Sequence, residues 1–269
     1  MIASRFMDGE TFAITLMEPL PGIAIAFEIE ALGMLFALVA GLLWVVTSIY
    51  SIGYMRGHNE QNQTRFFAAF AVSIAATMGI AFAANLFTLF LFYELLTLAT
   101  YPLVTHAGSP EAKRGGRTYL GILLGTSIGL LLLGILVTWS LTGRIDFEAG
   151  GILSGHIDPA WAGLLYALFL FGIGKAAVMP FHRWLPAAMV APTPVSALLH
   201  AVAVVKAGVF TLLKVTIYIF GGDFILSNDV TGGLIWVAAA TILIASMVAM
   251  TKDNLKARLA YSTVSQLSY

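Results

Sequence analysis

Residues 161–194 read WAGLLYALFLFGIGKAAVMPFHRWLPAAMVAPTP, an apolar run that contains one lysine and then four prolines. Its first part is apolar enough to enter a membrane as a helix. Glycines precede Lys175, and Pro180 follows it closely. An interior proline removes a backbone hydrogen bond and kinks or breaks a helix. We therefore predict one broken helix, interrupted around residues 174–182.

The composition of the whole chain places this run in a membrane protein. The 269 residues are 59% hydrophobic and only 10% charged, and the mean hydropathy is +0.90. Soluble domains carry roughly 25% charged residues, so the chain is expected to be an integral membrane protein in contact with the lipid bilayer. A formal net charge of zero argues against a nucleic-acid partner. The chain has no cysteine, which excludes disulfides and cysteine-ligated clusters within it.

Apolar runs of about 20 residues can span a bilayer as helices. They predict an all-α, polytopic bundle of transmembrane helices, with residues 1–269 forming a single membrane domain. Only Asn85 separates the second and third runs, which predicts a tight helical hairpin. We expect about seven complete spans and the start of an eighth near residue 259: 31–50, 66–84, 86–105, 118–140, 161–180, 195–220 and 232–250.

The loop charges give the predicted bundle an orientation. Cytoplasmic loops of membrane proteins are enriched in lysine and arginine. Alternate loops carry nine such residues, whereas the opposite side carries only Arg5 and Arg144 and is acidic. Residues 1–30 are therefore expected to form an extracytoplasmic segment. The nine basic residues are Arg56, Arg65, Lys113, Arg114, Arg117, Arg183, Lys252, Lys256 and Arg258.

Three ionisable residues, Glu94, Lys175 and Lys206, lie inside apolar stretches. A charge at the bilayer centre costs about 2.5–3.5 kcal/mol on insertion scales, so such residues are functional hypotheses by default. One acid with two lysines indicates a path for protons or cations. A desolvated lysine can lose its proton, which suits Lys175 to a relay. A broken helix beside an ionisable residue is a device of ion-coupled transporters.

Each of these residues also has a structural interpretation. Glu94 can form a structural ion pair or a protonated, hydrogen-bonded carboxyl, and Lys175 can extend its amine to the membrane surface. His200 precedes Lys206 by about 9 Å of helix and can extend a relay through water, or it is a packed side chain. Lys214, nearer the external end, is expected to extend its amine to the surface.

Three strings carry a resemblance to a known family. They are FYELLTLATYPLV at 92–104, GKAAVMPFHRWLPAAMVAPTPVSALLHAVAVVKAGVF at 174–210, and KARLAYSTVSQLSY at 256–269. They resemble the proton-translocating antiporter-like subunits, which include the large subunits of Mrp-type cation/proton antiporters and the antiporter-like subunits of complex I. The lysine in VVKAGVF makes the chain more similar to the D-type or A-type member of the Mrp complex, and the D-type member is the preferred assignment.

The resemblance implies roles for four residues. Glu94 matches the family's key glutamate and Lys175 the lysine of its broken helix. Lys206 matches the lysine of the following helix, and His200 the histidine before it. Together they imply one proton half-channel. Family members contain two inverted repeats, and residues 30–269 match only the first antiporter-like half, so the chain is expected to be a fragment.

The expected function is a membrane subunit of a multisubunit Na⁺/proton antiporter in a bacterial inner membrane, carrying protons along these residues. Its expected partners are other membrane subunits, protons and Na⁺. We expect no bond chemistry, cofactor or metal in this chain. The alternative is a proton-pumping subunit of an NADH:quinone oxidoreductase (complex I) or a membrane hydrogenase.

Overall fold

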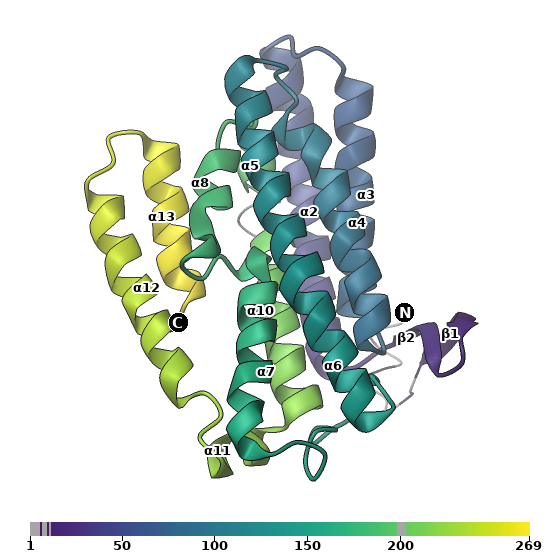
Figure 1. Cartoon of the computed structure of the whole chain (residues 1–269). Helices are drawn as coiled ribbons and strands as arrows, with labels where there is room; N and C mark the ends of the chain where they lie inside the picture. The colour runs from purple at the N-terminus through teal and green to yellow at the C-terminus, as the bar shows by residue number, and fades with distance from the viewer. Residues whose placement is uncertain (1–5, 7–9, 11, 198–202) are drawn as a thin grey trace.

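The computed structural model describes every residue except 1–5, 7–9, 11 and 198–202. Helices dominate it, as predicted (Figure 1). The elements before the helix break are β1 (Ala13–Leu20), β2 (Ile23–Glu28), α2 (Ala31–Gly57), α3 (Gln63–Ala81), α4 (Leu86–Val104), α5 (Pro110–Thr126), the π-helical turn η1 (Ser127–Leu131), α6 (Leu132–Thr142) and α7 (Pro159–Gly172).

After the break the elements are shorter until the chain reaches its last two helices. Figure 1 shows the last two helices, Gly232–Met250 and Leu255–Leu267, as a pair beside the main bundle, with the β hairpin on the opposite side, next to the lower end of α4. The elements after the break are the 3₁₀ turns η2 (Gly174–Ala176) and η3 (Phe181–Arg183), then α8 (Trp184–Ala188), α9 (Thr193–Val195), α10 (Val204–Lys214), the π-helical segment η5 (Val215–Phe220), α11 (Gly222–Ser227), α12 (Gly232–Met250) and α13 (Leu255–Leu267).

The hairpin of α3 and α4 is confirmed. Asn85 starts α4: its side-chain oxygen accepts a hydrogen bond from the Thr88 backbone N–H at 2.8 Å, which caps the helix. Its side-chain nitrogen donates to the Ala24 carbonyl, also at 2.8 Å. The one residue that separates the two apolar runs therefore ends the turn and binds the hairpin to β2.

The antiparallel pair β1–β2 is an element that the sequence analysis missed, because it predicted only an extracytoplasmic segment there. The hairpin is joined to the start of α4. The Ala26 backbone N–H donates to the Thr88 hydroxyl at 3.0 Å, and the rings of Phe27 and Phe92 meet edge to face at 5.4 Å. These contacts position Glu28 and Glu30 at the end of the bundle.

The apolar spans agree with the predicted ones within a few residues in most cases. Among the described residues, five helices are long and apolar enough to cross a membrane, counting α5 to α6 as one helix over 110–142. The largest differences are α5, which begins at Pro110 instead of 118, α2, which continues to Gly57, and α7, which ends at Gly172 and is therefore shorter than the predicted span 161–180.

The shortening of α7 is the predicted break. After Gly172 the chain makes a 3₁₀ turn, passes through Ala177 in the left-handed region (φ 57°), and resumes a helix only at Trp184. A non-glycine residue there is uncommon and costs energy, so the surrounding packing must hold it. The interruption thus extends slightly beyond the predicted 174–182 on both sides.

Candidate functional site

Lys175 lies at the centre of the break and is completely buried, with 0% of its surface exposed. It belongs to the 3₁₀ turn η2, in which backbone hydrogen bonds join an N–H to the carbonyl three residues back, instead of four as in an α-helix. The Trp184 indole N–H donates to the Gly174 carbonyl at 2.8 Å, so the far side of the break closes onto the near side. This burial rules out the interpretation that the Lys175 amine reaches the membrane surface.

Helix α4 supplies the partners of the Lys175 amine. Its Nζ donates to the Tyr93 carbonyl at 2.8 Å and to the Thr97 hydroxyl oxygen at 2.5 Å. It also lies 3.2 Å from the centroid of the Tyr93 ring, which attracts a cation through its face. The Tyr93 hydroxyl in turn accepts from the Lys175 backbone N–H at 3.1 Å. Tyr93 therefore binds both the backbone and the side chain of Lys175.

Thr97 is a functional candidate that the sequence analysis missed. Its own hydroxyl proton is donated to the Tyr93 carbonyl at 3.1 Å, so its oxygen serves Lys175 as an acceptor. One turn further along α4, the Thr100 hydroxyl forms a short hydrogen bond with the Tyr119 hydroxyl of α5. The spacing of Thr97 and Thr100 from Glu94 on one helix was the available signal, but threonine is common in transmembrane helices.

Glu94 lies next to Tyr93 but is not ion-paired with Lys175. Both of its carboxyl oxygens are buried, and no residue in the described part of the chain hydrogen-bonds either one. The structural ion pair considered from the sequence is therefore absent among the described residues. The Lys175 amine therefore donates only to uncharged oxygens, those of the Tyr93 carbonyl and the Thr97 hydroxyl, among the described residues. The carboxyl oxygens of Glu94 have no hydrogen-bond partner there.

Lys206 is not brought together with Lys175. Two residues further along α10, Gly208 packs directly against the backbone of Lys175 and Ala176. Two residues correspond to a rotation of about 200° around a helix, so Lys206 lies on the opposite face. It is exposed there, among apolar side chains of α2 and α10. His200 lies outside the described residues.

The expectation for Lys214 was wrong. Its side chain does not reach the surface: it is 1% exposed and forms an ion pair with Glu30, with Nζ and Oε1 2.7 Å apart. The same amine donates to the Ala83 carbonyl at 2.6 Å and lies 4.2 Å from the Phe147 ring centroid. The pair was missed because Glu30 is far away in sequence and is positioned by the unpredicted β hairpin.

The family model described as "NADH:quinone oxidoreductase/Mrp antiporter, TM" matches residues 83–269. The model described as "NADH-Ubiquinone oxidoreductase (complex I), chain 5 N-terminus" matches residues 21–67. The two matches include Glu94, Lys175, Lys206 and His200 in the first and Glu30 in the second.

Three similar proteins include both kinds that the family description names, a quinone oxidoreductase chain and Mrp-type antiporter chains. The NAD(P)H-quinone oxidoreductase chain 5 of a Picosynechococcus species is 28% identical over 100% of this chain and 41% of its own. A Staphylococcus epidermidis protein named as an antiporter subunit, mnhA2, is 32% identical over 89% of this chain and 30% of its own. In the solved Mrp complex from Dietzia sp., the matching chain is 28% identical, with a TM-score of 0.82 over 96% of this chain and 28% of that one.

The chain thus spans less than half the length of these relatives. The names that they carry are chain 5, an antiporter subunit with the letter A, and a chain of an Mrp complex, so the assignment to the D-type member of an Mrp complex stays a prediction.

Proposed function

This chain belongs to the family of NADH:quinone oxidoreductase and Mrp antiporter membrane subunits, and from that premise we propose that it carries protons in a multisubunit Na⁺/proton antiporter. It is an integral membrane protein, and its relatives are subunits of multisubunit membrane complexes. The bacterial antiporter relative indicates a bacterial cell membrane.

One observation carries the proposal: a lysine with no exposed surface sits at a break in a membrane helix, and the helix that binds its amine carries a buried carboxyl group, Glu94, with no hydrogen-bond partner among the described residues. A buried ammonium is costly unless it is paired, and a lysine amine can lose its proton where an arginine cannot. The neutral acceptors on Tyr93 and Thr97 can hold either the ammonium or the amine. Lys175 is therefore suited to take up and release a proton in place.

The proposed path starts on the predicted cytoplasmic side of the break, where η2, η3 and α8 interrupt the spanning helix. A proton would reach Lys175 and pass on towards Lys206 and His200. Glu94 would control the transfer: a carboxylate close to the amine holds its proton, and separation releases it. Since Lys206 faces away from Lys175, this last step requires water or a change in conformation.

The test reconstitutes the complex that contains this chain in vesicles with a pH-sensitive dye inside. We expect cation-driven proton flux to be lost with Glu94→Ala and with Lys175→Ala. Lys113→Ala, which removes an exposed lysine in the first turn of α5, is the matched control and should keep the flux. Retained flux in both membrane variants would overturn the proposal.

The second candidate is a proton-pumping subunit of an NADH:quinone oxidoreductase. The match of residues 21–67 to the chain 5 N-terminus and the likeness to chain 5 of Picosynechococcus favour it. The two candidates differ in what drives the flux. Proton movement that follows a Na⁺ gradient supports the antiporter, and movement that requires NADH and quinone supports the oxidoreductase.

A further inference from the structure

A groove of about 380 Å³ runs between α2 and α10, on the face of α10 that points away from Lys175. Its walls are apolar except for one side chain, the lysine at 206. The residues that form its two sides are Leu35, Val39 and Leu43 of α2 and Lys206, Val209 and Leu213 of α10.

Each wall of the groove is one stripe of a helix. Lys206, Val209 and Leu213 follow the spacing i, i+3, i+7, which lines up side chains on a single face. Leu35 and Val39 of α2 are 63% and 47% exposed, so the stripe on that side is also uncovered. Two parallel apolar stripes with a hollow between them have the shape that accepts a third helix.

The depth of Lys206 follows from two contacts between the same helices. The Lys214–Glu30 pair fixes the external end, and the stacked rings of Phe210 and Phe36, 4.8 Å apart, come next. Lys206 lies eight residues from Lys214, about 12 Å further into the membrane. It therefore faces the groove near the middle of α2, far from either end of that helix.

Lys214 is a buried lysine of α10, the helix of Lys206, and its ammonium group is fully paired. It receives a carboxylate, a backbone carbonyl and an aromatic face within 4.2 Å. Lys206 forms no hydrogen bond or ion pair with any described residue, and none of the described side chains that line the groove is an acceptor. Lipid tails would cover the apolar walls but leave the charge unpaired in hydrocarbon.

We propose that this groove receives a transmembrane helix that carries a carboxylate at mid-membrane depth, paired with Lys206. Apolar side chains of the incoming helix, one turn to either side of its acid, would pack between Leu35, Val39 and Leu213. The acid would give Lys206 the counter-charge that Glu30 gives Lys214. This inference concerns association and does not depend on proton transport.

The test uses the full chain in lipid vesicles, with a fluorescent donor on Gln61→Cys, an exposed loop position in a protein without other cysteines. The probe is a synthetic transmembrane helix of leucine and alanine with an acceptor dye and one central glutamic acid. A second probe carries glutamine instead. We expect energy transfer to report about tenfold tighter association of the glutamic acid probe than of the glutamine probe.

Three variants separate the charge from the groove. Lys206→Arg should keep the preference, and Lys206→Met should abolish it. The double variant Lys206→Met with Leu243→Lys moves the lysine to the exposed face of α12, where Leu243 is 65% exposed, and should not restore it. The proposal is overturned by equal association of both probes with the wild type, by a preference that survives Lys206→Met, or by one that follows the lysine to α12.

Discussion

At Lys175, two oxygen atoms of α4 decide where the amine rests. The Tyr93 carbonyl is fixed by the helix backbone, whereas the Thr97 oxygen belongs to a side chain that can be replaced. Thr97 is thus a positioning residue for Lys175, placed one turn beyond the carboxyl group of Glu94.

Thr97→Val keeps the shape of the side chain and removes the acceptor. A lost hydrogen bond to a charged group costs about 1.5–3 kcal/mol, so we expect proton flux in reconstituted vesicles to fall at least tenfold. Thr97→Ser should keep the flux because the acceptor remains. Thr100→Val is the matched control, since Thr100 contacts Tyr119 and not Lys175; an equal loss there would contradict the special role of Thr97.

The Lys214–Glu30 ion pair is expected to stabilise the folded protein. Removing one partner of a buried ion pair leaves the other charge without compensation, which costs about 3–5 kcal/mol. Glu30 keeps 19% of its side chain exposed, so we expect Lys214→Met to lower the free energy of unfolding by about 3 kcal/mol. Calorimetry or denaturant unfolding in detergent measures this change.

The double variant Lys214→Met with Glu30→Leu is the control for that experiment. Since it removes both charges, most of the lost stability should return. If the free energy of unfolding of Lys214→Met lies within about 0.5 kcal/mol of the wild-type value, the lysine instead reaches water.

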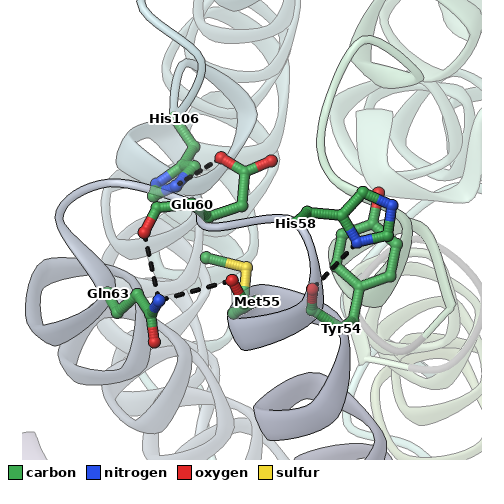
Figure 2. Close-up of polar contacts among 6 residues, drawn as sticks. All are labelled: Tyr54, Met55, His58, Glu60, Gln63 and His106. Atoms are coloured by element: carbon green, nitrogen blue, oxygen red, sulfur yellow. Dashed lines mark hydrogen bonds and ion pairs between the residues drawn. The ribbon is translucent and has the colours of Figure 1, made fainter.

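Among the elements, the loops that join α2 to α3 and α4 to α5 meet at one polar junction. Figure 2 shows His106 facing Glu60, with a separation of 3.6 Å between Nε2 and Oε2. Gln63 joins the same loop by donating to the backbone carbonyls of Glu60 at 3.1 Å and Met55 at 3.3 Å. The junction holds the ends of four helices together outside the apolar spans.

His106 makes this junction sensitive to acid. Burial lowers its pKa from the ordinary 6.5, Glu60 opposes the shift, and Arg65 adds to it. Burial outweighs the carboxylate, since the His106 side chain is 2% exposed and its Nδ1 has no hydrogen-bond partner among the described residues. The imidazole is therefore neutral in the folded protein at neutral pH.

The sign of the pH effect follows from that shift. The unfolded chain binds a proton at His106 more readily than the folded one, so the contribution to stability is complete above pH 6.5 and declines as the pH falls towards the lowered pKa. We expect His106→Phe to lose less stability on acidification than the wild type in detergent unfolding. His58→Phe, at an exposed position, is the control; a wild type that gains stability on acidification relative to His106→Phe would mean that the pair with Glu60 prevails.

The elements also show what a sequence can and cannot predict. The helix break followed from glycine and proline chemistry near Lys175, and the α3–α4 hairpin from Asn85 between two apolar runs. Both signals are local. The β hairpin was missed because its two short strands near the N-terminus are stabilised by contacts with the start of α4, such as that between Ala26 and Thr88.

For the whole molecule, the ionisable residues of the membrane spans separate into a buried group and an exposed one. Lys175 is buried at the break and Glu94 lies on α4, the helix that binds the Lys175 amine, whereas Lys206 faces an apolar groove on the far side of α10. Apolar spacing located all three residues in membrane spans, but periodicity over a short, partly π-helical element did not determine which way Lys206 points. The partner of Lys214 was likewise unpredictable, because it depends on how the N-terminal segment folds back.

The most direct test of proton transfer through Lys175 is the proton flux of the reconstituted complex with Lys175→Arg. Arginine keeps the positive charge and the hydrogen-bond donors but does not release its proton. With assembly of the variant complex checked by size-exclusion chromatography and Lys113→Arg as control, we predict that the flux falls to the background of protein-free vesicles. A Lys175→Arg complex that carries protons at the wild-type rate would contradict the account.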